Sequence, residues 1–215
     1  MKSMLIIGAG EFGKNLARKL MSVGNEVLII DVNEEEINKI APEVTRAQVG
    51  DCMDKGVLSE LGVRNFDICF VCISQNFQSS LEITSLLKEQ GAVHIVAKSD
   101  SENQTYLLKK VGADEVVYPE KDMADRTAMR YSMHGAFDYI ELSPEYAIVE
   151  AAVPSEWTGQ SIRELNVRLK HRVNILGLRN ERHIDPVITA DHLFAKGDRI
   201  IISGEKDDIS KLLDK

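Results

Sequence analysis

The first two-thirds of the chain alternates short apolar runs with amphipathic segments. The runs are of strand length and most are almost wholly hydrophobic, which is typical of parallel strands buried on both faces. Six such runs are Met4–Ile7, Val27–Ile30, Arg46–Val49, Ile68–Ile73, His94–Ala97 and Glu115–Val117. Between them, segments such as Phe12–Val23 repeat apolar residues at helical spacing. The alternation predicts an α/β fold with a doubly wound, parallel, Rossmann-like sheet.

A different pattern follows a further helix, which is expected over residues 119–131 with Asp122 as its N-cap. From Phe137 onward the chain is rich in alternating, strand-like segments that end in one last helix. The change predicts two domains. Residues 1–134 would form a Rossmann-like nucleotide-binding domain, and residues 135–215 a small C-terminal α+β domain.

The composition narrows the class of protein. The 215 residues include 34 acids and 26 Lys or Arg, for a net charge of −8. An acidic chain argues against a broad nucleic-acid-binding face, since such faces are usually basic. No apolar run is long enough to span a membrane, and the first strand begins too early to leave room for a signal peptide. The sequence therefore predicts a cytoplasmic protein with no nucleic-acid partner.

The chain has three cysteines, Cys52, Cys69 and Cys72. A small, odd number indicates reduced thiols rather than a disulfide framework. Cys69 and Cys72 form a C-x-x-C, but they lie inside the apolar run I-C-F-V-C-I, where residues three apart point to opposite faces of a strand. We therefore expect buried structural cysteines instead of a redox pair.

A glycine-rich turn follows the first apolar run, with Gly8, Gly10 and Gly13 in the pattern G-x-G-x-x-G. The first glycine allows the tight turn, the second lets the backbone approach a pyrophosphate, and the third lets the helix pack close to the strand. The helix N-terminus then presents N–H groups and a partial positive charge to the phosphates. Asp31 ends the second strand, where a carboxylate can accept hydrogen bonds from ribose hydroxyls. Together these residues predict a site for a nucleotide with a diphosphate and a ribose.

Other polar residues follow strands at the same edge of the predicted sheet. Asp51 follows the third strand, Lys98 ends the fifth, and Ser74-Gln75-Asn76 follows the fourth. Doubly wound sheets bind ligands outside these strand ends, so we expect Asp51 near the base and Lys98 near a phosphate. Solvated loops also place polar residues at strand ends, and this alternative stays open.

The common catalytic signatures are absent from the sequence. There is no G-x-S-x-G, no H-E-x-x-H and no G-x-x-x-x-G-K-[ST]. The pattern therefore favours a nucleotide-binding module that is not an enzyme. The alternative is a small NAD-dependent oxidoreductase, in which Asp31 would favour NAD over NADP. A soluble dinucleotide-sensing repressor is a third, weaker interpretation, because no helix-turn-helix is evident.

Longer stretches are more specific than the glycine pattern: L-I-I-D-V-N-E-E-E-I-N, K-K-V-G-A-D-E-V-V-Y-P-E-K-D-M-A and I-E-L-S-P-E-Y-A-I-V-E. Over nearly the whole chain, they resemble the RCK (regulator of conductance of K⁺) family, in its KtrA-like branch with one TrkA-N and one TrkA-C domain. The resemblance implies a regulatory subunit of a Ktr/Trk-type potassium transporter. Such subunits form homodimers that assemble into an octameric ring under a membrane-embedded potassium-translocating subunit. ATP, ADP or NAD(H) gates that partner by shifting the ring's conformation.

The resemblance also implies roles for individual residues. The implied nucleotide contacts are Gly8, Gly10, Glu11, Phe12, Gly13, Asp31, Asp51 and Lys98. Glu120 matches a carboxylate associated with a divalent cation, Mg²⁺ or Ca²⁺, at the dimer interface, but it also fits an ordinary first-turn helix acid. Arg168 and Asn174 match the spacing of a cyclic di-AMP site, and they fit a solvated basic turn equally well.

Glu11 is the main departure from the family pattern. Related glycine motifs often carry arginine between the second and third glycines, where it can meet a nucleotide phosphate. An acid beside phosphates is unfavourable unless it turns outward or shares a cation. This departure argues against ATP relative to NAD or ADP, or for a Mg²⁺-bridged mode of binding.

Overall fold

The computed structural model describes residues 1–179 and 183–214. The chain divides into two compact units, Met1–Glu120 (the N-terminal unit) and Lys121–Lys215 (the C-terminal unit). The units meet between Glu120 and Lys121, inside the helix Pro119–Ser132. The domain boundary expected from the change in hydrophobic pattern was near residue 134. Among the described residues, no helix is long and apolar enough to cross a membrane.

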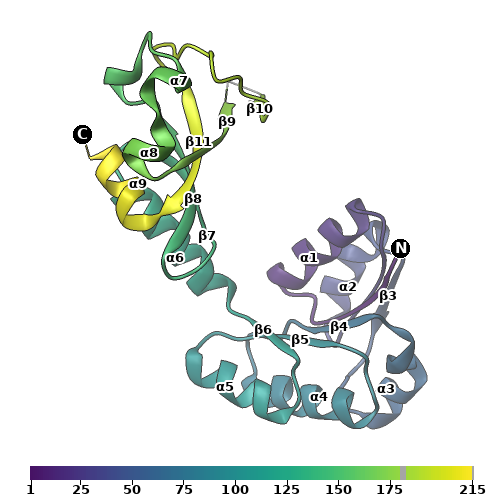
Figure 1. The fold of residues 1–215 in the computed structure, drawn as a ribbon. Coiled ribbons are helices and arrows are strands. Elements are labelled where there is room, and N and C mark those ends of the chain that lie inside the picture. Colours follow the sequence, from purple (N-terminus) through teal and green to yellow (C-terminus); the bar gives the residue numbers. More distant parts are fainter. Residues whose placement is uncertain (180–182, 215) are drawn as a thin grey trace. The chain divides into compact units, whose positions relative to one another are not determined.

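The N-terminal unit is built on a six-stranded parallel sheet with strand order β3-β2-β1-β4-β5-β6 (Figure 1). The strands are β1 Ser3–Ile7, β2 Glu26–Asp31, β3 Arg46–Val49, β4 Ile68–Val71, β5 Ile95–Lys98 and β6 Glu115–Val117. Ile7 at the end of β1 pairs in register with Ile30 on one side and Val71 on the other. The strand order therefore reverses beside β1, which is where doubly wound sheets bind ligands. The predicted Rossmann-like sheet is confirmed.

Helices cover both faces of this sheet (Figure 1). They are α1 Glu11–Ser22, α2 Glu34–Ile40, α3 Lys55–Leu61, α4 Phe77–Glu89 and α5 Glu102–Val111, with short 3-10 turns at Ala41–Glu43 and Val63–Asn65. Neighbouring residues of β1 face opposite ways, as a pleated strand requires. Leu5 packs in a cluster with Leu87 of α4, and Ile6 in a cluster with Ile37 of α2. This double burial explains why β1 reads as a continuous apolar run.

The fourth strand is shorter than predicted. It ends at Val71, although the apolar run extends to Ile73. Cys72 still donates its N–H to the Ile7 carbonyl oxygen at 2.7 Å, after which the chain turns toward α4, whose N-cap is Asn76. The strand therefore ends two residues before the hydrophobic run does.

The cysteines are buried and unpaired, as predicted. Cys69 and Cys72 belong to the two clusters on opposite faces of the sheet. Burial raises the pKa of both thiols to about 12, so they remain protonated at neutral pH. A redox pair would need a thiolate, and neither sulfur provides one.

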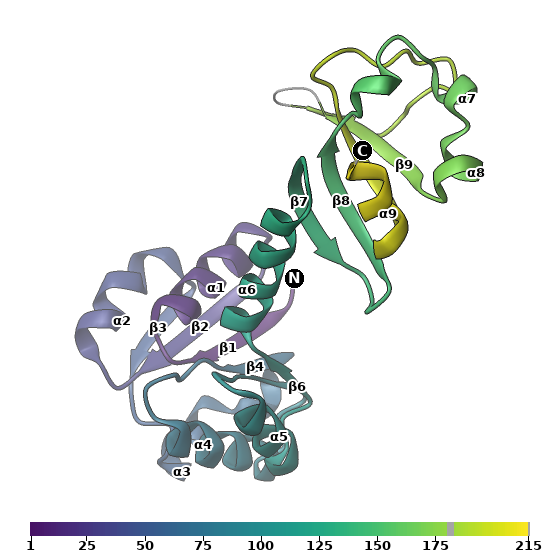
Figure 2. The same ribbon diagram turned by 90° about the vertical axis from the view of Figure 1, so that its left-hand side faces the viewer.

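The C-terminal unit contains an antiparallel sheet with strand order β10-β9-β11-β8-β7. Its strands are β7 Ala136–Glu141, β8 Tyr146–Ala152, β9 Asn174–Arg179, β10 Ile184–Asp185 and β11 Arg199–Glu205. Its helices are α6 Pro119–Ser132, α7 Ile162–Leu165, α8 Val167–His171 and α9 Lys206–Leu213, with a 3-10 turn at Ser155–Trp157. α9 lies against β8 and β11 (Figure 2), and the core beneath includes the buried side chains of Trp157, Tyr139 and Phe194. The predicted small α+β domain is confirmed.

The start of α6 differs from the prediction. The helix begins at Pro119, so Asp122 lies within its first turns and does not cap it. Proline suits a first helical turn because its missing N–H would have no helical partner there. Pro119 therefore begins the helix.

A capping box begins α7. Glu164 donates its N–H to Ser161 Oγ at 3.2 Å, and the Glu164 carboxylate accepts the Ser161 N–H at 2.8 Å. We expect Ser161→Ala to lower the free energy of unfolding by about 1 kcal/mol, because a helix N–H loses its acceptor. Urea denaturation followed by fluorescence of Trp157 in the same core would measure it. Ser155→Ala, at an exposed serine nearby, should stay within about 0.5 kcal/mol of the parent, and an equal effect would contradict the assignment.

Candidate nucleotide-binding site

A cavity of about 610 Å³ opens at the carboxyl ends of β1 to β4 in the N-terminal unit. Its lining comes from the segments that follow these four strands: Gly8, Gly10 and Glu11; Asp31, Val32, Asn33 and Glu36; residues 50–53; and residues 72–76. The cavity lies beside the point where the strand order reverses, as expected for a ligand site in this fold. Its volume falls within the range of small-molecule sites.

The three glycines have different structural roles. Gly8 has a φ of +110°, and a Cβ there would lie 2.9 Å from the Cys72 carbonyl oxygen. A Cβ at Gly13 would lie only 2.0 Å from the Gly8 carbonyl oxygen, so helix α1 could not approach β1 as closely. Gly10 has no atom within 4 Å of such a Cβ, and it lines the cavity. Gly8 and Gly13 therefore shape the turn, and Gly10 leaves open space where a ligand would lie.

The N-terminus of α1 opens on this cavity. The helix begins at Glu11 with Gly10 as its N-cap, and both residues line the cavity. The first N–H groups of a helix have no acceptor within it, which makes such an end suitable for a phosphate. The Phe12 side chain, by contrast, packs against the apolar cluster around Ile6, and Phe12 does not line the cavity.

Asp31 joins the loops that follow β1 and β2. Its Oδ2 accepts the Ala9 N–H at 2.6 Å and its Oδ1 accepts the Asn33 N–H at 2.8 Å. Each carboxylate oxygen retains a further lone pair, so Asp31 can also accept a ribose hydroxyl. Asp51 lines the same cavity and accepts the Met53 N–H at 2.9 Å. The structure thus brings both predicted acids to one cavity.

A buried lysine holds two acids at the edge of the cavity. The Lys14 ammonium lies 2.7 Å from Glu11 Oε1 and 2.5 Å from Glu36 Oε2. Hydrogen bonds from Lys14 lower the pKa of Glu11, and those from Lys14 and Lys39 lower the pKa of Glu36 to about 2. Both carboxylates are therefore ionised at neutral pH. Sequence reasoning missed Lys14 and Glu36, although the i,i+3 spacing of Glu11 and Lys14 was a usable signal.

The structure does not bring Lys98 to the cavity lining. Its buried ammonium donates to Ser74 Oγ at 2.8 Å and to Asp100 Oδ1 at 2.7 Å, and it lies 2.8 Å from Glu120 Oε1. Burial lowers the pKa of Lys98, but the two carboxylates outweigh it and raise the pKa overall. All three ammonium donors have partners. Lys98 therefore affects the cavity only through its hydrogen bond to Ser74, which lines it.

Glu120 lies exposed in the first turn of α6. Its hydrogen bond with Lys98 is the main cause of its lowered pKa. In residues 1–179 and 183–214, no group of three or more His, Cys, Asp or Glu side chains is placed to hold a metal ion.

Arg168 and Asn174 lie together in the C-terminal unit. The Arg168 Nε donates to Asn174 Oδ1 at 2.8 Å, and both residues are exposed. Neither residue lines the cavity in the N-terminal unit.

Comparisons with known proteins agree with this architecture. Residues 4–119 match the TrkA-N domain family, and residues 146–215 match the TrkA-C domain family. The chain is 35% identical over 210 residues to Ktr system potassium uptake protein C of Bacillus subtilis (strain 168), covering 98% of this chain and 95% of that protein. Ktr system potassium uptake protein A of the same organism matches with the same identity and coverage. A solved GsuK channel bound to NAD is similar in fold, with a TM-score of 0.69 and 18% identity over 98% of this chain and 38% of that chain.

Proposed function

This chain belongs to the family of TrkA-N and TrkA-C domain proteins that includes the Ktr potassium uptake proteins, and on that premise we propose that it is a cytoplasmic, nucleotide-sensing regulatory subunit of a potassium uptake transporter. The observation that carries the proposal is the cavity at the glycine turn, with Asp31 placed for a ribose. The partner would be a membrane-embedded potassium-translocating subunit, beside which this subunit sits at the inner face of the membrane. Homodimers assembled into an octameric ring would transmit the ligand signal.

The charge of the cavity indicates which nucleotide it prefers. Four carboxylates line it, from Glu11, Asp31, Glu36 and Asp51, and no Lys or Arg does so within the described part of the chain. A free triphosphate would bring more negative charge to these acids than the diphosphate of NAD does. Two unit charges 4 Å apart repel by about 1 kcal/mol in water and by more in a partly buried site. We therefore assign NAD(H) as the preferred ligand, followed by ADP, with ATP entering as its Mg²⁺ complex.

Regulation without chemistry fits the side chains of this cavity. Its lining holds no histidine among the described residues, and burial raises the pKa of its two thiols, Cys52 and Cys72, to about 12. Such thiols cannot act as nucleophiles at neutral pH. The relatives are potassium uptake proteins and give no support to the alternative of a small NAD-dependent oxidoreductase. The ligand would act by binding two conformations with different affinity.

Two finer features belong to the same proposal. A divalent cation, Mg²⁺ or Ca²⁺, would bind Glu120 where a second copy supplies further carboxylates, and it would compete there with Lys98. Cyclic di-AMP would bind the C-terminal unit at Arg168 and Asn174, through the arginine fork and the amide.

Calorimetric titration of the full-length chain with NAD⁺, NADH, ADP and ATP, with and without Mg²⁺, tests the function. We expect saturable binding of NAD⁺ or NADH, no consumption of the bound NADH, and a change in small-angle scattering on binding. Failure of all four nucleotides to bind would contradict a nucleotide sensor. Equal affinity in two isolated conformations would contradict gating by this site.

Glu11, the acid inside the glycine motif, allows a test of the proposed preference for NAD(H) over ATP. We expect Glu11→Gln to raise the affinity for Mg²⁺-free ATP by three- to tenfold, because it removes about 1 kcal/mol of repulsion. The affinity for NAD⁺ should change less. Glu34→Gln is the matched control, since Glu34 is an exposed first-turn acid of α2 outside the lining. An equal gain in both variants would show a general charge effect, and no gain in Glu11→Gln would contradict the role given to Glu11.

A further inference from the structure

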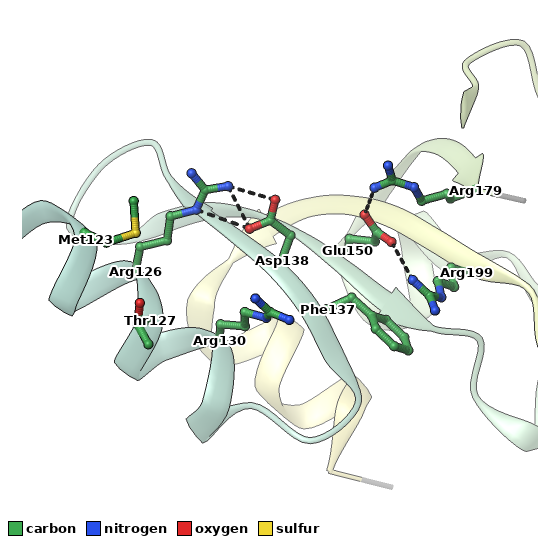
Figure 3. Close-up of a pocket in the computed structure, with 9 residues that line it drawn as sticks. All are labelled: Met123, Arg126, Thr127, Arg130, Phe137, Asp138, Glu150, Arg179 and Arg199. Atoms are coloured by element: carbon green, nitrogen blue, oxygen red, sulfur yellow. Dashed lines mark hydrogen bonds and ion pairs between the residues drawn. The ribbon is translucent and has the colours of Figure 1, made fainter. Parts of the chain in front are cut away.

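A second cavity, of about 370 Å³, lies within the C-terminal unit between α6 and the sheet (Figure 3). Four arginines line it: Arg126 and Arg130 from α6, Arg179 from β9 and Arg199 from β11. Only two acids, Asp138 of β7 and Glu150 of β8, line it with them among the described residues. The cavity therefore carries a surplus of positive charge in a chain whose net charge is −8.

The two acids are already paired. Arg126 forms a bidentate pair with Asp138, whose two oxygens each lie 2.8 Å from Nη2. Glu150, only 7% exposed, accepts from Arg179 Nη1 at 2.5 Å and from Arg199 Nη1 at 3.4 Å. Figure 3 shows Arg126 reaching from α6 to Asp138, and Glu150 between Arg179 and Arg199 on the sheet. Both carboxylates are thus committed to neighbouring guanidinium groups.

Several guanidinium N–H groups of these arginines have no carboxylate partner among the described residues. Arg130 has no carboxylate oxygen of a described residue within 4.0 Å, although its charge acts on the nearby Asp138, and its guanidinium lies 5.3 Å from the Tyr131 ring centre. Arg199 stacks on Phe137 at 3.6 Å from the ring centre, which fixes the plane of its guanidinium. Each guanidinium carries five N–H donors. Contacts with described residues use Nε and Nη2 of Arg126 in three hydrogen bonds, but only Nη1 of Arg179 and only Nη1 of Arg199.

We propose that this arginine-lined cavity binds a small, soluble, phosphate-bearing anion, a ligand separate from the nucleotide of the N-terminal unit. An ion-pair network that only stabilised the sheet would balance its charges, because close like charges repel. Here an anion would neutralise the two surplus charges. Planar guanidinium forks match phosphate oxygens in bidentate geometry, and Arg126, Arg179 and Arg199 are already held in place by their contacts. The volume suits a compact ligand.

Titration of the full-length chain with inorganic pyrophosphate, at fixed ionic strength and in excess NAD⁺, tests this proposal. The NAD⁺ occupies the glycine turn, so the remaining signal reports other sites. We expect saturable binding that Arg130→Gln weakens about tenfold, the value of one charge-assisted hydrogen bond. Arg130→Lys should weaken binding less, because it keeps the charge and loses only the fork.

Lys196→Gln is the matched control, since Lys196 is an exposed residue of the same unit outside the cavity lining. It should bind pyrophosphate like the parent. Absence of saturable binding by the parent would overturn the proposal and leave an ion-pair network or a protein contact. Equal binding by the parent and by Arg130→Gln, with thermal unfolding showing both folded, would overturn it as well.

Discussion

Replacing Gly13 with alanine should lower the free energy of unfolding of the N-terminal unit by about 3 kcal/mol, at the upper end of the usual cost of overpacking. The added Cβ would lie 2.0 Å from the Gly8 carbonyl oxygen, and neither backbone segment can yield as a flexible side chain would. Helix α1 would have to move away from β1 and carry with it the N-terminus that we propose binds phosphate. NAD⁺ binding should therefore fall together with stability. Urea denaturation followed by circular dichroism measures the first effect.

Unfolding of the C-terminal unit can serve as an internal reference for this measurement. Trp157 is the only tryptophan, and it lies in the core of the C-terminal unit, so its fluorescence reports that unit. We expect the fluorescence transition to stay in place while the transition of the N-terminal unit moves to lower urea. A shift of both transitions would show that the two units unfold together, and a shift of neither would contradict the close packing at Gly13.

Gly10→Ala separates binding from folding. Gly10 has an ordinary φ of −66°, and nothing lies within 4 Å of an added Cβ, so stability should change by less than about 1 kcal/mol. The methyl group would nevertheless project where the cavity is open, and we expect NAD⁺ affinity to fall about tenfold. If Gly10→Ala bound NAD⁺ like the parent, the glycine turn would not be the phosphate-binding element.

Much of the fold was predictable because its causes are local. Buried strands such as Val27–Ile30 require continuous apolar residues, and Gly62 ends α3 with a φ of +67°, a conformation that glycine favours. The errors lie at boundaries where two local signals compete. Ile73 continues an apolar run beyond the end of its strand, and Asp122 is a good cap placed after a proline that had already begun the helix.

The sites were predictable only in part, because they join distant segments. Gly8 and Asp31 belong to one strand–helix–strand unit, and the fold brings both to one cavity. Lys98 ends its strand as expected, but Glu120 helps to hold its ammonium behind the lining, and no local pattern predicts that contact. The arginine-lined cavity is harder to predict from the sequence, because β9 and β11 must pair before Arg179 and Arg199 can share one buried acid, Glu150.

Asp31→Asn should weaken NAD⁺ binding by ten- to a hundredfold. The carboxylate already accepts N–H groups from Ala9 and Asn33, one on each oxygen. Asparagine keeps one acceptor oxygen, so a backbone N–H or the ribose hydroxyl must lose its partner. A hydrogen bond to a charged group contributes about 1.5–3 kcal/mol, which corresponds to this range of affinity. Calorimetric titration measures the affinity, and urea denaturation should show a loss of about 1 kcal/mol in stability.

The same variant tests whether the chain has separate sites. Asp31 lies in the N-terminal unit, whereas Arg168 and Asn174 lie in the C-terminal unit. Cyclic di-AMP bound at the latter pair should therefore keep its affinity in Asp31→Asn. Asp51→Asn is the control within the cavity, and it should weaken NAD⁺ by only a few-fold, because Asp51 is exposed and holds a single loop N–H. A larger loss from Asp51→Asn than from Asp31→Asn would contradict the assignment of the ribose to Asp31.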